Sequence, residues 1–393
     1  MREYLYHVAA RLLAFDNTSG NPSGEAMRFL AGELEGSGFR TVLQPVSIRG
    51  VEQHNLVAWA GPAAPDGLIL SGHVDTVPFA DQPGWTRPPL ALTVESDRVW
   101  GRGTADMKGF LAQCLTAARA LPVSRLERPV VLAFTAEEEV GCSGAERLAP
   151  ALQSLLGGVP MPRMAWIGEP TSWAVYHAHK GIVQLRVTVR GRGGHSSLPQ
   201  DGVNAISVAA RAIEAIGAYQ AELAAPRESM RQLFPDAPCT TLNVGRIRGG
   251  TASNMIADEC AFTVSYRPLP DRDPLEPWRE IERRMAGLAR TDYGGGSRSA
   301  SIDVSEPQVV PPLRSPVDTP LAAALQAVLG APPRGGAPYA TDGGRFAQAG
   351  IDVLICGPGA LADAHQPDEG LSRADFERGP EVILQVLNQL CLG

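Results

Sequence analysis

The chain has 393 residues, of which 44% are hydrophobic and 20% are charged, and this length can bury a full core in two domains or in one large domain with an insertion. The formal net charge of −7 argues against a nucleic-acid partner, which clustered Lys and Arg side chains would recognise. No apolar stretch approaches the length of a membrane span, and the six cysteines are scattered without a C-x-x-C pair, so we expect no membrane association and reduced thiols.

The first half of the chain alternates between helical patterns and buried strands. Its opening segment, "MREYLYHVAARLLAF", has the apolar spacing of a helix and lacks the small-residue cleavage site of a signal peptide, so we expect a cytoplasmic protein. The runs "HNLVAWA", "GLILSG", "RPVVLAFT" and "RMAWIG" predict strands, and "MKGFLAQCLTAARALP" predicts a helix with one apolar face. This alternation is typical of α/β layering.

The pattern changes at about Gly181. The runs "GIVQLRVTVRG", "TTLNVGRI", "IADECAFTVSYRPLP" and "ASIDVSEP" predict half-solvated strands, and "NAISVAARAIEAIGAY" and "PLEPWREIERRMAGLAR" predict amphipathic helices. Their β-α-β-β-α-β order is that of a compact α+β unit. The helix "TPLAAALQAVLG" and the buried strand "IDVLICG" then resume the α/β pattern of the first half of the chain. We therefore predict an α/β domain of residues 1–180 and 310–393, interrupted by an α+β domain of residues 181–309, with a mobile loop at "YGGGSRS".

Acidic and histidine side chains follow the predicted strands where each strand ends. They are His73 and Asp75 after "GLIL", Glu137, Glu138 and Glu139 after "VVLAFT", Glu169 after "MAWI", His365 after "IDVLICG", and Asp106 after "RVWGRG". Open α/β sheets form their ligand crevice at the carboxyl ends of strands, so we expect these side chains to converge. Each one alone is more often a structural or solvated residue. Three consecutive glutamates behind a buried strand, however, resist burial unless cations neutralise them.

A metal centre satisfies this set of charges. The residues with suitable donor atoms for Zn²⁺, Co²⁺ or Mn²⁺ are His73, Asp106, Glu139, Glu169 and His365. Five ligands are too many for one tetrahedral ion with an open position, so they predict two ions with one bridging carboxylate. Two adjacent divalent ions lower the pKa of a bridging water, which then supplies hydroxide near neutral pH.

Eight short motifs strengthen this prediction by their order. They are "SGHVDTVP", "GRGTADMKG", "TAEEEVGCSG", "GEPTS", "HKG", "GGHSS", "SNMIAD" and "GPG" followed by "AHQPDE". In this order and spacing they resemble the dinuclear-zinc amidohydrolase family that includes acetylornithine deacetylase, succinyl-diaminopimelate desuccinylase, aminoacylase and glutamate carboxypeptidase. The resemblance extends from His73 to Glu369. It implies a zinc-peptidase-like three-layer α/β catalytic domain with an inserted ferredoxin-like α+β domain that serves as a lid and a dimerisation domain.

The resemblance also implies a role for each matched metal ligand. His73 and Glu169 would bind one ion, His365 and Glu139 would bind the other, and Asp106 would bridge the two. The implied ions are two Zn²⁺, with Co²⁺ as the second choice. The family also implies a cis peptide bond after Asp106.

The implied catalytic residues are Asp75, Glu138 and His195. Asp75 would fix the tautomer of the metal-binding imidazole before it. Glu138 would be the general base that takes a proton from water and returns it to the leaving amine, although a shift of register by one residue within the glutamate run stays open. His195, which the family often supplies from the partner subunit, would donate to the oxyanion, and this implies a homodimer with a closing lid.

Two further residues of the inserted domain resemble substrate clamps. Arg267 in "SYRPLP" can pair with an α-carboxylate, and Asn254 in "SNMIAD" can hydrogen-bond the same group or the oxyanion. Without the resemblance, Arg267 is equally well explained as a surface arginine at a strand end.

The motifs carry two signals about the substrate, which the resemblance implies to be a small N-acyl amino acid. "GPGALADAHQPDE", "GWTRPPL" and "ADMKGF" look most like acetylornithine deacetylases, which implies conversion of N²-acetyl-L-ornithine to ornithine and acetate in arginine biosynthesis. "YATDGGRF" instead resembles succinyl-diaminopimelate desuccinylases, and a succinyl carboxylate would need a cation such as Arg345. The motifs are also compatible with an acetylcitrulline deacetylase, a general aminoacylase, an aminopeptidase, or a non-catalytic relic that binds metal or amino acids.

Overall fold

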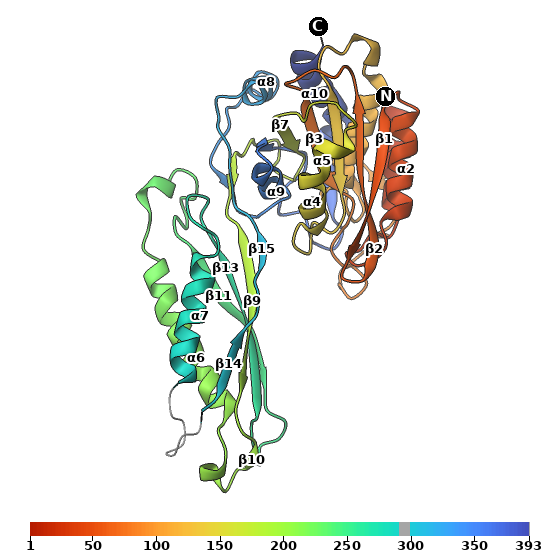
Figure 1. Cartoon of the computed structure of the whole chain (residues 1–393). Helices are drawn as coiled ribbons and strands as arrows, with labels where there is room; N and C mark the ends of the chain where they lie inside the picture. The colour runs from red at the N-terminus through yellow and green to blue at the C-terminus, as the bar shows by residue number, and fades with distance from the viewer. Residues whose placement is uncertain (291–298, 393) are drawn as a thin grey trace. The chain divides into compact units, whose positions relative to one another are not determined.

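A computed structural model describes residues 1–290 and 299–392. The chain forms two compact units (Figure 1): Met1–His179 with Leu313–Gly393, called the α/β unit here, and Lys180–Pro312, called the inserted unit. The predicted domain limits, at 180/181 and 309/310, lie within three residues of these boundaries. The predicted loop "YGGGSRS" falls almost entirely outside the described residues.

The α/β unit is built on a six-stranded sheet with the order β1-β2-β6-β3-β7-β18. Its strands are β1 (Arg40–Ile48), β2 (Val51–Ala60), β3 (Leu68–His73), β6 (Val130–Thr135), β7 (Met164–Ile167) and β18 (Asp352–Ile355). The last four are parallel to one another, whereas β2 and β1 are added antiparallel. Every residue of β3 and β6 is buried, because helices cover both faces of a parallel sheet.

Two groups of helices cover the two faces of this sheet. One hydrophobic core contains α1 (Arg2–Leu13), α2 (Gly24–Glu35), α3 (Lys108–Ala120), α8 (Pro320–Leu329) and α10 (Arg373–Cys391). The other contains α4 (Ser143–Leu148), α5 (Leu152–Leu155) and α9 (Gly343–Gln348). Successive residues of β2 alternate between the cores: Leu56 and Ala58 belong to the first, and Val57 and Trp59 to the second. The predicted three-layer arrangement is therefore confirmed.

Two small three-stranded sheets complete the α/β unit. One has the order β19-β5-β4 and consists of β4 (Thr93–Glu95), β5 (Arg98–Trp100) and β19 (Gly370–Ser372). The other has the order β16-β8-β17 and consists of β8 (Ala178–His179), β16 (Leu313–Arg314) and β17 (Gly336–Ala337). The chain enters and leaves the inserted unit through β8 and β16, which pair antiparallel.

The inserted unit has the predicted β-α-β-β-α-β order. Its elements are β9 (Ile182–Arg190), α6 (Ala205–Leu223), β11 (Thr241–Gly249), β13 (Glu259–Arg267), α7 (Glu276–Ala289) and β14 (Ser301–Val304). The antiparallel strand order β11-β13-β9-β14, with β15 (Gln308–Val310) also on β9, is ferredoxin-like. Both helices contribute to one core against the sheet, and β10 (Gly194–His195) pairs separately with β12 (Met255–Ile256). In the described part of the chain, no helix combines the length and hydropathy needed to cross a bilayer.

Candidate metal centre

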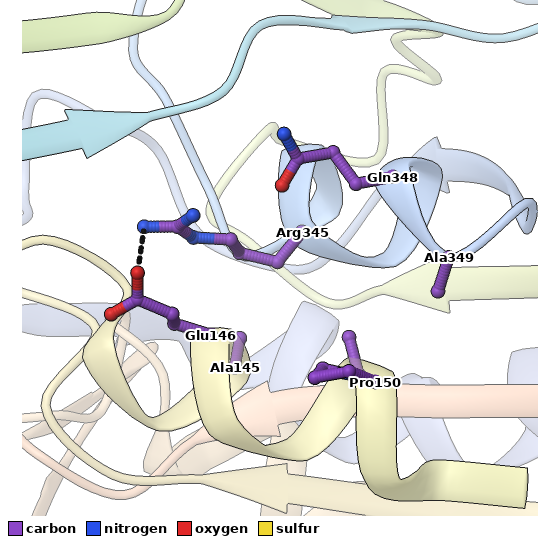
Figure 2. A pocket seen from close by; sticks show the side chains of 7 residues that line it. Ala145, Glu146, Pro150, Arg345, Gln348 and Ala349 are labelled. Atoms are coloured by element: carbon purple, nitrogen blue, oxygen red, sulfur yellow. Dashed lines mark ion pairs between the residues drawn. The ribbon is translucent and has the colours of Figure 1, made fainter.

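A pocket of about 160 Å³ lies between α4 and α9, and it is not the predicted site (Figure 2). Its lining includes Arg345, whose Nη2 lies 3.3 Å from Oε1 of Glu146. The predicted metal ligands lie elsewhere, at one edge of the central sheet. Arg345 is the cation that a succinyl group would need, and its side chain already has an acidic partner, Glu146, beside this pocket.

The carboxyl ends of the parallel strands bring the predicted ligands together. His73 is the last residue of β3, and the glutamate run and Glu169 each follow their strands, β6 and β7, after one residue. His365 lies in the loop between β18 and β19, and Asp106 lies between β5 and α3. Parallel strands end at a common edge, so residues up to 292 positions apart in the sequence become neighbours (365 minus 73).

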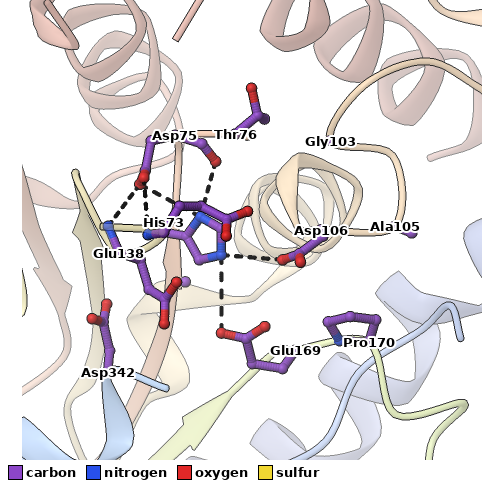
Figure 3. Close-up of polar contacts among 12 residues, drawn as sticks. His73, Asp75, Thr76, Gly103, Ala105, Asp106, Glu138, Glu169, Pro170 and Asp342 are labelled. Carbon is purple, nitrogen blue, oxygen red and sulfur yellow. Dashed lines mark hydrogen bonds and ion pairs between the residues drawn. The ribbon is translucent and has the colours of Figure 1, made fainter. Parts of the chain in front are cut away.

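Asp106 contacts both histidines, and Figure 3 shows its contact with His73. Its Oδ1 is 3.2 Å from Nε2 of His73, and its Oδ2 is 3.3 Å from Nε2 of His365. The peptide bond between Asp106 and Met107 is cis, as the resemblance implies. Each carboxylate oxygen thus faces a different imidazole, which is the arrangement expected of a bridging ligand.

The two remaining acids divide between the two histidines. Nε2 of His365 is 3.1 Å from Glu139, and Nε2 of His73 is 3.9 Å from Glu169. Donor atoms of His73, Asp106 and Glu139 all lie within 4.8 Å of one another. The structure therefore groups the five predicted ligands into two halves that share Asp106.

Burial and close charges shift the pKa values of these groups. Burial, followed by the charge of Asp106, raises the pKa values of Glu139 and Glu169. Burial acts to raise that of Asp106 as well, but hydrogen bonds with His365 and His73 hold its pKa below the usual range. Hydrogen bonds with Asp106 and Glu139 raise the pKa of His365 to about 10. Burial favours the neutral, protonated form of a carboxyl group, whereas a bound cation favours the charged carboxylate. A cluster of buried carboxylates is therefore suited to bind cations.

Asp75 contacts both the imidazole of His73 and the backbone of the glutamate run. Nδ1 of His73 is 3.0 Å from the backbone oxygen of Asp75 and 3.5 Å from its Oδ1. The carboxylate accepts the backbone N–H groups of Glu138 at 3.0 Å and of Glu139 at 3.1 Å. The peptide carbonyl thus makes the closest contact with the ring, and the side chain fixes the glutamate loop.

Glu138 lies beside the ligands in a second acidic group that sequence reasoning did not identify. This group contains Glu138, Cys142 and Asp342. Cys142 Sγ donates to Oε1 of Glu138 at 3.3 Å, and Thr135 donates to Oδ2 of Asp342 at 2.5 Å. Burial, more than any neighbouring charge, raises the pKa of Glu138. Asp342 lies within the quoted motif "YATDGGRF", but only its proximity to β6 in the fold reveals a position beside Glu138.

Glu137 points away from the ligands. Its Oε1 accepts the backbone N–H of Gly20 at 2.7 Å and the amide of Gln53 at 3.0 Å. These contacts show that Glu137 has a structural role. Within the glutamate run, the residue that contacts His365 is Glu139.

In the inserted unit, His195 and Asn254 lie on adjacent segments. The backbone N–H of Ser196 donates to the backbone oxygen of Asn254 at 3.1 Å, and His195 pairs with Met255 across β10 and β12. The backbone N–H of Ser197 donates to Nδ1 of His195 at 3.2 Å. In the neutral ring the hydrogen is then on Nε2, so this exposed nitrogen is a hydrogen-bond donor.

Arg267 lies at the other end of the inserted unit. It is the last residue of β13, and the next residue, Pro268, accepts a hydrogen bond from Gly181 at 3.0 Å, where the chain enters the unit. Asn254 precedes the start of β13, so a strand of about 26 Å separates the two residues, at ~3.3 Å per residue. The structure does not bring Arg267 together with Asn254 and His195 within one inserted unit.

The donor set fits a pair of divalent cations. It combines two imidazoles with three carboxylates, and no thiolate is among its donors, which is the chemistry of Zn²⁺, Co²⁺ or Mn²⁺ sites. Asp106, Glu139 and Glu169 each have a carboxylate oxygen within 4 Å of an imidazole nitrogen, so their negative charges face the centre of the ligand group. Nδ1 of His73 is held by a backbone carbonyl, as is usual for a metal-binding histidine.

Comparisons with known proteins identify the family of the chain. The family model "Peptidase family M20/M25/M40" matches residues 69–389. An acetylornithine deacetylase of Proteus mirabilis (strain HI4320) is 34% identical over 392 residues, which cover 99% of this chain and 96% of that protein. One of Klebsiella pneumoniae (strain 342) is 36% identical over 376 residues, which cover 93% and 90%.

Solved structures are similar over the whole chain. The M20 family metallo-carboxypeptidase Sso-CP2 of Sulfolobus solfataricus has a TM-score of 0.78 at 19% identity and covers 99% of each chain. The YXEP protein of Bacillus subtilis, described as a dinuclear metal-binding peptidase of the M20 family, has a TM-score of 0.65 at 14% identity, with 97% of this chain and 96% of that chain covered. At these identities the likeness shows a shared fold.

Proposed function

The chain belongs to the peptidase family M20/M25/M40 and is a hydrolase that acts on amide bonds; on this premise we propose that it removes the acetyl group of an N-acetylated amino acid. Its relatives at 34% and 36% identity are acetylornithine deacetylases. The proposed reaction is therefore hydrolysis of N²-acetyl-L-ornithine to L-ornithine and acetate, a step of arginine biosynthesis.

The position of Asp106 carries the metal-dependent part of this proposal. Its two oxygens lie 3.2 Å and 3.3 Å from two different imidazole nitrogens, and this supports a carboxylate shared by two cations. The proposed ligands of one ion are His73 and Glu169, and those of the other are His365 and Glu139. Zn²⁺ is the proposed metal, and Co²⁺ is the second choice.

Glu138 is the proposed general base. When bound, two divalent cations would polarise the substrate carbonyl and lower the pKa of the attacking water. Because burial raises the pKa of Glu138, its carboxylate accepts a proton more readily than an exposed glutamate does. Glu138 takes a proton from the water that attacks the amide carbon and donates it to the leaving nitrogen. Asp75 holds the backbone of Glu138 during both transfers.

His195 and Asn254 are proposed to act from the partner subunit. Nε2 of His195 is a donor in the neutral ring, as an oxyanion requires. Arg267 lies at the end of the inserted unit where the chain enters, whereas His195 and Asn254 lie near the opposite end of β13. We propose that Arg267 binds the substrate carboxylate and that the oxyanion donor is the partner subunit's His195.

The proposed dimer forms through the inserted unit. β11 is at one end of the strand order β11-β13-β9-β14, and such an edge strand offers unpaired backbone groups to a second copy. Large hydrophobic side chains that are 43–52% exposed lie on this unit: Leu198, Ile206, Ile247 and Met255. A symmetric pair of edge strands would cover both features.

A desuccinylase function receives less support. A succinyl carboxylate needs a cation in the acyl pocket, and the candidate Arg345 pairs with Glu146 beside the pocket between α4 and α9. An acetyl group needs only a small apolar space, so it makes no such demand.

A substrate panel tests the proposal. The chain, loaded with Zn²⁺ or Co²⁺, is assayed with acetylornithine, acetylcitrulline, succinyl-diaminopimelate, further N-acyl amino acids and free peptides. We expect the highest kcat/KM with acetylornithine. A higher value with succinyl-diaminopimelate would replace acetyl with succinyl as the preferred group, and inactivity on the whole panel with two metals bound would favour a binding relic.

A further inference from the structure

A buried ion pair lies beside the metal ligands. Nη1 of Arg102 is 2.7 Å from Oε2 of Glu369, and each side chain is 1% exposed. Removing two charges from water costs several kcal/mol per ion, and further hydrogen bonds must offset this cost. The further hydrogen bonds of Arg102 and Glu369 therefore identify the segments that this ion pair holds in place.

Glu369 fastens the loop that presents Asp106. Its Oε1 accepts three backbone N–H groups, from Gly103 at 3.0 Å, Ala105 at 2.9 Å and Asp106 at 3.0 Å. Three donors on one oxygen fix the direction of the backbone, because each must point at the same place. The backbone of Asp106 is therefore anchored by a residue 263 positions away in the sequence.

Arg102 extends this anchor to His365. Its Nη2 donates to Oε1 of Gln82, and Nε2 of Gln82 donates to the backbone oxygen of His365 at 2.7 Å. Glu369 also follows His365 in the same loop, and its backbone oxygen accepts the N–H of Gly101 at 2.9 Å. One network thus joins the two loops that carry Asp106 and His365.

The other half of the metal centre has its own supports. His73 ends β3, and Glu169 follows β7 after one residue, so both leave buried parallel strands. The hydrogen bonds of Glu369, Arg102 and Gln82 described above end on the loops of Asp106 and His365, and not on these two strands. The two halves therefore differ in how strongly they depend on this network.

We propose that Glu369, through Arg102, is a positioning residue that sets the affinity of the metal held by His365 and Glu139, more than that of the metal held by His73 and Glu169. This inference rests on the proposed two-metal function. Asp106, which both metals share, keeps its contact with His73 when the network is broken. The ion next to His365 loses the fixed geometry of two of its three ligands.

Stepwise metal binding to Glu369→Gln tests this inference. An amide has one acceptor oxygen, so either the three N–H groups or Arg102 must then face an NH₂ group. Calorimetry and the absorption spectrum of Co²⁺, added to the metal-free full-length protein, follow the two binding steps. We expect the step that fills the position of His365 and Glu139 to weaken by a factor of about 10–100, and the other step to change less than about threefold.

Asp363→Asn is the matched control. Asp363 lies in the same loop as His365, but its carboxylate pairs with Arg98 at 2.9 Å and is half-exposed at 36%. This substitution removes a charge of the same sign from the same loop and leaves Glu369 intact. We expect both binding steps to match those of the unmodified chain.

Gln82→Ala is a second test variant for the case in which Glu369→Gln does not fold. It removes the side chain that joins Arg102 to the backbone of His365, and selective weakening of one step supports the inference. Unchanged affinities, or an equal loss in both steps, would overturn it. If the unmodified chain binds only one ion, the two-metal proposal itself fails, which is a different result.

Discussion

The carboxylate of Asp75 accepts the backbone N–H of Glu138 at 3.0 Å. This contact joins the segment after β3 to the segment after β6, and a second one, from Glu139 at 3.1 Å, strengthens it. Asp75, which was expected to act on the His73 imidazole, therefore also sets the backbone direction of the proposed base Glu138 and of the proposed metal ligand Glu139.

Asp75→Asn should lower activity through this loop. An amide can accept only one of the two N–H groups with its oxygen, and its NH₂ group must face the other. We expect kcat/KM to fall by about 10–100-fold. Ser19→Ala, which removes a hydroxyl donor 3.1 Å from the same carboxylate, is the control and should change kcat/KM only slightly. Full activity of Asp75→Asn would show that the loop needs no such support.

Glu138→Ala should abolish turnover and leave the metals in place. Loss of a general base costs about 10²–10⁴-fold in rate, whereas metal analysis should still give two ions per chain. Glu137→Gln is the neighbouring control, because its carboxylate accepts from Gly20 and Gln53 and not from substrate. If Glu137→Gln loses activity and Glu138→Ala retains it, the register of the base is shifted by one residue.

Removal of the metals should lower the melting temperature. The buried carboxylates of Asp106, Glu139 and Glu169 repel one another without cations. An ion present at 100 times its Kd stabilises by ~2.7 kcal/mol, so chelation should lower Tm by roughly 5–10 °C. Adding Zn²⁺ back should restore the original Tm. The same shift is expected in Glu138→Ala, since Glu138 is not a proposed ligand, and equal Tm values with and without chelator would count against a structural metal contribution.

Gly357→Ala should destabilise the chain next to Glu169. A Cβ at this position would lie 2.3 Å from the backbone oxygen of Gly168 and 2.6 Å from that of Glu169. Because neither backbone atom can rotate away, we expect a loss of about 1–3 kcal/mol in urea unfolding. Gly32→Ala is the control, since nothing lies within 4 Å of its Cβ and an alanine in a helix stabilises by about 0.5–1 kcal/mol. Equal unfolding midpoints for the two variants would contradict this close approach.

Ile247→Asp should disrupt the proposed dimer. Ile247 is 51% exposed on the edge strand β11, and a carboxylate there would have to be buried against a second copy. Light scattering after size exclusion should show a dimer for the original chain and a monomer for this variant. Val317→Asp changes a residue of the α/β unit that is 48% exposed, and it should remain dimeric. A monomeric original chain would exclude the dimer outright.

Local patterns in the sequence predicted the elements well, because periodicity and strand composition depend on adjacent residues. The run "RPVVLAFT" predicted a strand that ends at Thr135, and the observed β6 ends there. The position of the proposed ligands followed from the same reasoning, since His73 and Glu169 come at or just after the ends of buried strands.

Contacts over long sequence distances could not be predicted in this way. Asp342 and Thr135 are 207 positions apart, and Glu369 and Asp106 are 263 apart. Asp342 and Glu369 lie in loops or at a helix start, where no periodicity indicates which face a side chain takes. Only the assembled fold places Asp342 beside Glu138 and Glu369 beneath Asp106.

The ends of the inserted unit lie side by side, and this affects how the chain folds. His179 and Leu313 are partners in β8 and β16, and Ile182 and Val310 are partners in β9 and β15. Pairing of β7 with β18 closes a loop that contains the whole insertion. The entropy cost of closing such a loop grows with its number of free residues. An insertion that folds first removes its own residues from this loop and leaves only residues 168–179 and 313–351 to be closed. The rate of sheet completion should therefore depend little on the length of the insertion.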